Sequence, residues 1–377
     1  MVKLEEMRVS RVSVKNFRSI KNLRLDGLQE FSVLIGQNGV GKSNLMSIFS
    51  FLSDCISVGN ISTVVEKIGI DHLCHNGNTK SPTEIAITFR DGELNTTQYS
   101  IKIVYDNNKV VVADEQLIVS NKANKGAQNY HELHNKRGKC SLGGSVEHIN
   151  STDVALSIFG RLPKKYRETS AVYNFLKDVY TINFALTELR SEFQKDSKYI
   201  SYRGNNLKSV ALVMQNSSPK SFARVVEHMR CALDITAIKL QKLPSGDIAL
   251  SFIQGEKEIS EGEISDGMLS LFAYYVLLEQ PLKSSMLCIE EPERNISPNS
   301  LTQLAEVMRV KAHEGNAQIL VTSHSPEFIS ALQMDEVFYV TMEENNTLVT
   351  PLKDNKALES DMPLGELYTI GLIDAAI

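Results

Sequence analysis

The sequence predicts an α/β fold built on a mainly parallel sheet. One observation is the part of the chain from residue 264 onward, where apolar helices alternate with short apolar strands, as expected of parallel strands joined by crossover helices. A second is LIGQNGVGKSNLM, Leu34 to Met46, where a strand-like run meets a glycine-rich turn and then a helix. A third is the length of 377 residues, which suits one elaborated domain or two. We therefore expect both ends of the chain to share one sheet.

The glycine-rich turn has the spacing of a P-loop. Its glycines follow the order G-x-x-G-x-G, whereas a Rossmann turn has G-x-G-x-x-G. Read as Gly36-x-x-x-x-Gly41-Lys42-Ser43, it matches a loop whose backbone N–H groups hold phosphates, whose lysine reaches the β and γ oxygens, and whose serine binds Mg²⁺. The helix from Lys42 would point its positive N-terminal dipole at the phosphates. The sequence therefore predicts a nucleotide and magnesium site.

The remaining elements follow in order along the chain. Residues 7–35 form three alternating runs, which predict a short strand meander ending at the P-loop, and three more strand-like runs lie between 84 and 120. Residues 121–150 are polar and glycine-rich and are predicted to be a mobile loop or a decorated hairpin. The apolar spacing is helical from 151 to 232, and strands return at 235–254. We therefore expect 1–120 and 236–377 to form the nucleotide-binding unit and 121–235 to be an inserted arm or lid.

Composition limits the class of protein. The net charge is −5 and the pI about 6.0, so any DNA-binding face must be a local patch, such as the basic run RLPKKYR from Arg161. No apolar run reaches the roughly 18 residues of a membrane span, and the N-terminus has no secretory pattern. The five cysteines are odd in number and lack C-x-x-C pairs, which indicates reduced thiols. We expect a cytoplasmic protein without a membrane partner.

Two strand ends in the C-terminal third carry chemistry for hydrolysis. MLCIEEPE is an apolar strand ending in acids: Glu290 is placed to support Mg²⁺, and Glu291 to polarise the water that attacks the γ-phosphate. ILVTSHSP is a second buried strand, and it delivers His324, where a neutral imidazole would sense the γ-phosphate. The alternatives are solvated carboxylates and a structural histidine.

A long apolar helix begins at GEISDGMLSLFAYY. Ser265 is a good N-cap and Asp266 suits a first helical turn, so one interpretation is a plain capped helix. The other is a second phosphate-binding helix end, where Gly267 would allow the nucleotide of another subunit to approach closely.

The order of these motifs, P-loop, signature helix, acidic strand and switch histidine, resembles the ABC-type ATPases of the SMC, RecF and OLD group. More narrowly, the chain resembles compact bacterial members, AAA-family predicted ATPases without a long coiled coil or a nuclease domain. The resemblance covers both ends of the chain, fades between about residues 60 and 180, and rests on VKNFRSIKNLRL, LIGQNGVGKSNLM, ISDGMLSLFAYYVLL, CIEEPERNISPNS, ILVTSHSPEFISA and LGELYTIG. It implies an ABC-type ATPase head with a mixed sheet and a helical insert.

The resemblance also implies roles for single residues. In that family two subunits sandwich two ATP molecules, so that Ser265, Asp266 and Gly267 would meet the partner's γ-phosphate across a homodimer. Glu291 would be the hydrolytic base and His324 the switch, while Ser43 and Glu290 would hold Mg²⁺. Arg18 would reach the nucleotide from the first strands, although an exposed salt bridge explains it nearly as well. The implied nucleotide-binding residues are Arg18, Gly36, Asn38, Gly39, Gly41, Lys42, Ser43 and Asn44.

The implied function is an ATP-hydrolysing dimerisation switch that acts on DNA or controls a partner effector encoded nearby, in anti-phage defence or DNA maintenance. One alternative is a membrane-transporter ATPase subunit, which is disfavoured because ISDGM replaces the transporters' Leu-Ser-Gly-Gly-Gln. The other is a nucleotide-dependent scaffold that never hydrolyses ATP, which is disfavoured because Glu291 and His324 are both present.

Three points stay open at this stage. The glutamine loop of the family has three candidates, Gln98, Gln116 and Gln194. The segment ERNISPNS replaces the family's usual Gly-Leu-His-Pro turn after the acids, so the subunit contact made there is undefined. The motifs DHLCH and HELH hold residue types that bind zinc, although their spacing is not that of a paired tetrahedral site: His72, Cys74, His75, His131 and His134.

Overall fold

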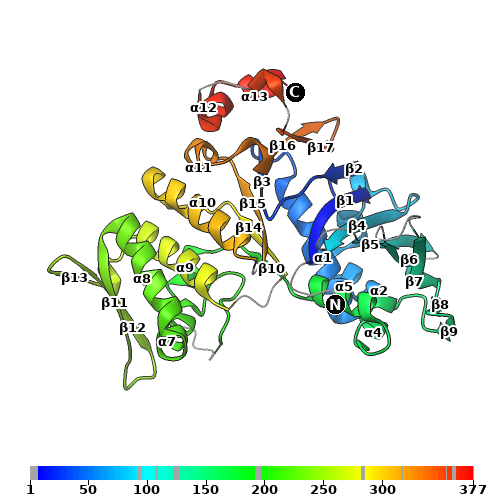
Figure 1. Cartoon of the computed structure of the whole chain (residues 1–377), viewed down its shortest axis with the longest axis horizontal. Coiled ribbons are helices and arrows are strands. Elements are labelled where there is room, and N and C mark those ends of the chain that lie inside the picture. Colours follow the sequence, from blue (N-terminus) through cyan, green and yellow to red (C-terminus); the bar gives the residue numbers. More distant parts are fainter. Residues whose placement is uncertain are drawn as a thin grey trace.

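Three β-sheets organise the chain, and helices pack between and around them (Figure 1). The computed structural model describes residues 7–91, 95–106, 109–121, 128–191, 197–281, 285–315, 317–353, 355–358 and 362–376. Among these residues, no helix is long and apolar enough to cross a membrane.

The central sheet has six strands and joins the two ends of the chain. Its order is β10-β14-β15-β3-β16-β17, and every neighbouring pair is parallel except β16 and β17, which makes the sheet mixed. The expectation that the P-loop strand shares a sheet with the C-terminal third is therefore confirmed. The strands are β3 (Phe31–Ile35), β10 (Val179–Ile182), β14 (Met286–Glu290), β15 (Gln318–Ser323), β16 (Val337–Glu343) and β17 (Asn346–Pro351).

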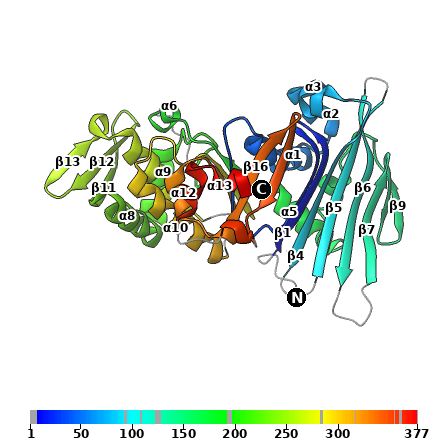
Figure 2. The ribbon, with the colours of Figure 1, turned by 90° about the horizontal axis from the view of Figure 1, so that it is seen from above.

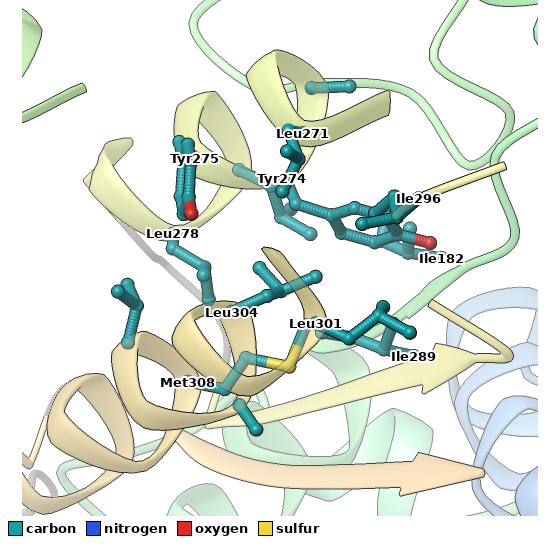
Figure 3. Packing of buried hydrophobic residues seen from close by; sticks show 14 of the residues in the cluster. Ile182, Leu271, Tyr274, Tyr275, Leu278, Ile289, Ile296, Leu301, Leu304 and Met308 are labelled. Carbon is teal, nitrogen blue, oxygen red and sulfur yellow. The ribbon is translucent and has the colours of Figure 1, made fainter. Parts of the chain in front are cut away.

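Alternate residues of the central strands face two different hydrophobic cores. In β3, Phe31, Val33 and Ile35 point into one core, and Leu34 points into the other. A strand that is buried on both faces has apolar residues at every position, which is the pattern of FSVLI. The first core lies under α9 (Asp266–Glu279) and α10 (Pro298–His313), where Tyr274 and Met308 are buried together (Figure 3). The second lies under α1 (Lys42–Val58) and α5 (Arg167–Lys177).

The second core is closed by an antiparallel sheet of eight strands in the order β2-β1-β4-β5-β6-β7-β8-β9. Its strands alternate buried and more exposed residues because one face packs on helices and the other does not. The strands are β1 (Met7–Phe17), β2 (Ile20–Asp26), β4 (Thr83–Asp91), β5 (Asn95–Asp106), β6 (Lys109–Asn121), β7 (Gln128–Lys136), β8 (Lys139–Leu142) and β9 (Ser145–His148), and the other helices on this side are α2 (Ile61–Ile68), α3 (Ile70–Leu73) and α4 (Ala155–Phe159).

The molecule has two lobes on opposite sides of the central sheet (Figure 2). The first lobe contains the eight-stranded sheet, and the second, other lobe contains the three-stranded sheet. Its elements are α6 (Leu186–Leu189), α7 (Leu207–Ser217), α8 (Pro219–Leu233), β11 (Ile235–Lys242), β12 (Ile248–Gln254) and β13 (Lys257–Ser260), together with α9. Three short helices complete the C-terminal part: α11 (Pro326–Ser330) lies between β15 and β16, and α12 (Leu364–Thr369) and α13 (Leu372–Ala376) follow β17.

Three details bear on the sequence expectations. The N-terminal strands are not one meander, because β3 leaves β1 and β2 for the central sheet, where both of its faces are buried. Residues 128–148 form β7 to β9, which pair as consecutive hairpins, so the hairpin alternative is confirmed for them, and residues 122–127 lie outside the described part of the chain. The stretch expected to be helical contains β10, a strand of four residues. The division at 120/121 and 235/236 stays a prediction.

Candidate nucleotide-binding and hydrolysis site

The predicted catalytic residues lie at the carboxyl ends of neighbouring parallel strands. β15 lies between β3 and β14, so that the residue pairs are Leu34 with Thr322 and Thr322 with Glu290. The P-loop follows β3, His324 follows β15, and Glu290 ends β14. Because the carboxyl ends of parallel strands meet at one edge of a sheet, the structure brings these three features together, and this edge is where ligands bind in open α/β sheets.

Two glycines of the P-loop are required by close backbone packing. A Cβ at Gly36 would lie 2.3 Å from the carbonyl oxygen of Val340 in β16. At Gly41, which has φ of 100° and precedes α1, a Cβ would lie 2.1 Å from Oγ1 of Thr347 in β17. Only glycine fits such positions. The strands that follow His324 in the sequence therefore support the back of the loop.

Lys42 lies inside the loop. Its Nζ donates hydrogen bonds to the carbonyl oxygens of Gly36 (2.6 Å) and Gln37 (2.8 Å), and the residue is only 5% exposed. Burial lowers the pKa of Lys42, and the charges of Glu291 and Glu293 act in the opposite direction. Lys42 is the first residue of α1, and its ammonium group therefore lies at the N-terminal end of the helix, where phosphates bind. This is the position that the P-loop assignment requires.

Ser43 and Glu290 face each other across the predicted metal site. Ser43 Oγ donates to Glu290 Oε2 at 3.5 Å, and Asn183 Nδ2 donates to the same oxygen at 3.1 Å. Burial raises the pKa of Glu290, while the hydrogen bonds from Asn183 and Ser43 lower it. A hydroxyl and a carboxylate are the oxygen ligands that Mg²⁺ prefers, so this donor set fits the ion.

Glu291 has a strained backbone and a paired side chain. Its φ is 45°, a region that residues other than glycine seldom adopt, and its N–H donates to Thr322 O at 3.0 Å. Oε2 accepts two hydrogen bonds from Arg294, from Nε at 2.8 Å and from Nη2 at 2.5 Å. Oε1 lies 3.9 Å from His324 Nδ1. The predicted base and the predicted switch are therefore side by side.

Glu293 positions the loop that carries His324. Its Oε1 accepts hydrogen bonds from the backbone N–H of His324 (2.7 Å) and from Ser323 Oγ (3.0 Å), and His324 Nδ1 lies 3.1 Å from the same oxygen. The sequence analysis did not assign a role to Glu293. The signal was present, since Glu293 is the third acid of EEPE, two residues after the predicted base.

Arg18 is influenced by the charge of the predicted metal ligand Glu290. Burial lowers the pKa of Arg18, and the charge of Glu290 raises it. Arg18 lies in the turn between β1 and β2 with φ of 51°, and its backbone N–H donates to Leu73 O at 2.7 Å. The ring of His75 holds the same turn, with Nδ1 3.1 Å from the Arg18 carbonyl oxygen. A role of Arg18 at the nucleotide stays a prediction.

The candidate zinc motif DHLCH thus supports the turn of Arg18. Within the ranges that the structure describes, no group of three or more metal-binding side chains occurs. Of the two asparagines predicted in the P-loop region, Asn38 is exposed in the loop, and Asn44 Nδ2 donates to Ser19 Oγ at 2.7 Å. Asn44 therefore links α1 to the Arg18 turn.

The signature residues do not meet the P-loop of the same chain. Ser265 caps α9, accepting from Met268 N, and Asp266 pairs with Arg190 Nη2 at 2.6 Å. A Cβ at Gly267 would lie 2.7 Å from Asn295 O, so this glycine is required by a contact within the chain. Figures 1 and 2 show α9 and α1 on opposite sides of the central sheet. A role of these three residues at the nucleotide of another subunit stays a prediction.

Asn183 is a site residue that the sequence analysis missed. Gln98 and Gln116 lie on β5 and β6 in the eight-stranded sheet, and Gln194 lies outside the described residues. Asn183, directly after β10, contacts Glu290 instead. A strand of four residues inside a helical stretch is too short to show a period of two.

Comparison with known proteins identifies related domains. A model described as "AAA ATPase domain" matches residues 7–273. A second, described as "AAA domain, putative AbiEii toxin, Type IV TA system", matches residues 239–330. The first match covers the P-loop and the start of α9, and the second covers the acidic strand and His324.

Curated relatives and a solved structure agree with these matches. The chain is 20% identical to the Old nuclease of Escherichia phage P2 over 365 residues, 91% of this chain and 60% of that protein. It is 37% identical to the DNA replication and repair protein RecF of Bacteroides fragilis over 54 residues, 14% of this chain and 15% of RecF. The chain therefore spans less than two thirds of the length of these relatives. A structure of an SMC head bound to the C-winged helix domain of ScpA superposes with a TM-score of 0.55 at 12% identity, covering 93% of this chain and 99% of that chain, which confirms the fold.

Proposed function

The chain belongs to the AAA ATPase domain family and is an ATPase of the SMC, RecF and OLD kind, and from this premise we propose that it works as an ATP-driven dimerisation switch. The proposal rests on one observation: the predicted nucleotide-binding residues and the predicted signature residues lie in different parts of the subunit. Lys42, Glu290 and His324 converge at one edge of the central sheet, whereas α9 begins in the other lobe. The signature residues complete a site only if a second copy supplies them.

The residues of one edge account for hydrolysis. Lys42 binds the β and γ oxygens of ATP as a point charge, and Arg18 adds a second cation beside Glu290. Glu291 accepts the proton of the attacking water as general base, and His324, held by Glu293, contacts the γ-phosphate. Mg²⁺, held by Ser43 and Glu290, supplies charge neutralisation on the phosphate oxygens when it is bound.

The output that we propose is action on DNA or control of a partner effector, in anti-phage defence or DNA maintenance. The relatives named above are a phage nuclease and a replication and repair protein, and the solved head is bound to a partner domain, which favours this output over a transporter. A surface supports it. Between α4 and α5, Arg161, Lys164 and Lys165 are exposed, and an adjoining pocket of about 560 Å³ is lined by residues that include Arg161, Tyr173 and Lys177. The location that we propose is the cytoplasm, since the cysteines are free.

Light scattering of the Glu291→Gln protein with and without ATP and Mg²⁺ tests the switch. The substitution keeps ATP bound by slowing hydrolysis, so the mass in solution should rise to that of a dimer only when ATP is present. A monomer in ATP, at concentrations where calorimetry shows the nucleotide bound, would rule out the switch and leave an ATPase that acts alone.

A further inference from the structure

The predicted base is engaged by an arginine of its own turn. Arg294 donates two hydrogen bonds to one carboxylate oxygen of Glu291, at 2.8 and 2.5 Å. The side chain of Glu291 is 20% exposed, and that of Arg294 is 55% exposed. Hydrogen bonds between two charged groups are among the strongest in proteins, and two of them fix the orientation of both side chains. The carboxylate therefore has a set position in the single subunit.

The hydrogen bonds from Arg294 limit how Glu291 can approach an attacking water. Both of them are accepted by Oε2, and Oε1 lies 3.9 Å from His324 Nδ1. A general base must be within hydrogen-bond reach of the proton that it takes. The carboxylate keeps its orientation while both bonds hold, and it can turn toward a water at the γ-phosphate once they are broken.

The turn that carries Arg294 is in backbone contact with the start of α9. Asn295 O approaches Gly267 so closely that a Cβ would lie 2.7 Å away. The next residue, Ile296, is buried in the same core as Leu271 and Tyr274 of α9 (Figure 3). Backbone hydrogen bonds from Arg294 N to Glu291 O and from Ile296 N to Glu293 O close the turn. The start of α9 and the turn that carries Arg294 are therefore in direct contact.

We propose that Arg294 restrains Glu291 in the single subunit, and that the restraint is released when the nucleotide of a second copy binds at Ser265 to Gly267. This inference rests on the proposed ATP-bound dimer and adds to it a positioning residue that acts through Glu291. It explains how an ATPase that binds nucleotide in each subunit postpones hydrolysis until two subunits meet.

Phosphate release per subunit, measured over a range of protein concentrations, tests the restraint. The wild-type rate should be low in dilute protein and rise as dimers form. Arg294→Gln should raise the dilute rate about tenfold, equivalent to about 1.4 kcal/mol, and leave the concentrated rate unchanged. Arg294→Lys, which keeps a single point charge, should lie between them and replaces Arg294→Gln if that variant does not fold.

The matched control is Arg230→Gln. Arg230 pairs with Glu227, also three residues away, through Nε at 2.8 Å and Nη2 at 2.5 Å, and its side chain is equally exposed at 55%, but the pair lies on α8. Its rate should equal that of the wild type. If Arg294→Gln and Arg294→Lys are no faster in dilute protein while Glu291→Gln slows hydrolysis by at least ~10²-fold, the restraint is refuted and the base assignment stands. If Glu291→Gln hydrolyses ATP at the wild-type rate, the base assignment fails, and the restraint fails with it.

Discussion

The amide of Asn183 donates a 3.1 Å hydrogen bond to Glu290 Oε2, the oxygen that Ser43 Oγ also approaches. Asn183 belongs at the same time to the second lobe, because its N–H donates to Tyr202 O at 3.0 Å, in the segment that leads into α7. A single side chain thus links the predicted metal site to the lobe that contains the signature helix.

Asn183→Ala should weaken Mg²⁺ binding, so that hydrolysis needs a higher Mg²⁺ concentration. Glu290 would lose the donor that orients it, and removal of such a supporting contact typically costs at least ~10-fold in metal affinity. When phosphate release is measured against Mg²⁺ concentration, the concentration that gives half the maximal rate should rise about 10-fold. Gln98→Ala, on the eight-stranded sheet, is the control and should shift nothing. Equal curves for all three proteins would mean that Asn183 does not support the metal site.

Lys42→Ala should abolish ATP binding. The loop loses its only point charge for the β and γ phosphates. Calorimetry against ATP and Mg²⁺ measures the result, and circular dichroism checks folding, because the carbonyl oxygens of Gly36 and Gln37 lose their partner. Retained affinity in a folded protein would refute the P-loop assignment.

Ser265→Arg should prevent ATP-dependent association while one ATP still binds per subunit. The bulky side chain would fill the space of the partner's γ-phosphate. Ser265 also caps α9, and loss of a cap costs about 1 kcal/mol, so Ser265→Ala is the matched control. In the Glu291→Gln background, light scattering with ATP should show a dimer for Ser265→Ala only. Dimers in both variants would exclude Ser265 from the shared site.

Stability should depend on Glu279 in acid. Its side chain is fully buried in α9; burial disfavours its charge, but hydrogen bonds from His228, Lys311 and Arg224 prevail and hold its pKa at about 2. Because the folded pKa is below the ordinary value of about 4.3, the stabilisation is complete above that value and disappears as the pH falls toward 2.

Glu279→Gln should therefore lower the unfolding free energy by about 2 kcal/mol at pH 7, since the buried Lys311 would lose one of its two charged partners and keep Glu314. The difference from the wild type should shrink between pH 5 and pH 2. Urea titrations at several pH values measure it, with Glu227→Gln, in an exposed pair on α8, as the control. A difference that does not change with pH would contradict the ion-pair account.

If DNA is the ligand, reversing Lys164 and Lys165 to Glu should weaken binding to all sequences alike and flatten its salt dependence. With fewer contacts to DNA phosphates, binding displaces fewer counterions from the DNA. Fluorescence anisotropy with duplex DNA at several salt concentrations measures both effects, and ATPase without DNA should barely change. Lys239 and Lys257, reversed together on the three-stranded sheet, are the control. An unchanged slope, or no DNA affinity of the ATP-bound dimer, would leave the effector as the ligand.

The sequence predicted the parts of the site that depend on local pattern. The P-loop needs a fixed order of glycines, lysine and serine, and β14 and β15 are apolar runs that end in Glu290 and His324. Parallel strands with crossover helices then required these residues to meet at one edge, and the structure confirms this arrangement.

The missed parts depend on contacts between distant or very short segments. Asn183 follows a strand of four residues, in which no period is visible. β9, at the edge of the eight-stranded sheet, is a polar strand of four residues whose composition resembles that of a loop. The pairing of Arg294 with Glu291 occurs in a turn where Glu291 has a positive φ, which the sequence pattern does not predict.

The position of β3 has a consequence for synthesis of the chain on the ribosome. β3 lies between β15 and β16, whose residues are made long after Ile35. Until then this apolar strand has neither of its neighbours, and the back of the phosphate loop, formed by Val340 and Thr347, does not exist. Strand pairings between residues this distant in sequence form late, and hydrophobic strands stay exposed until they form. We therefore expect a nascent chain to bind ATP only after β16 and β17 have been made.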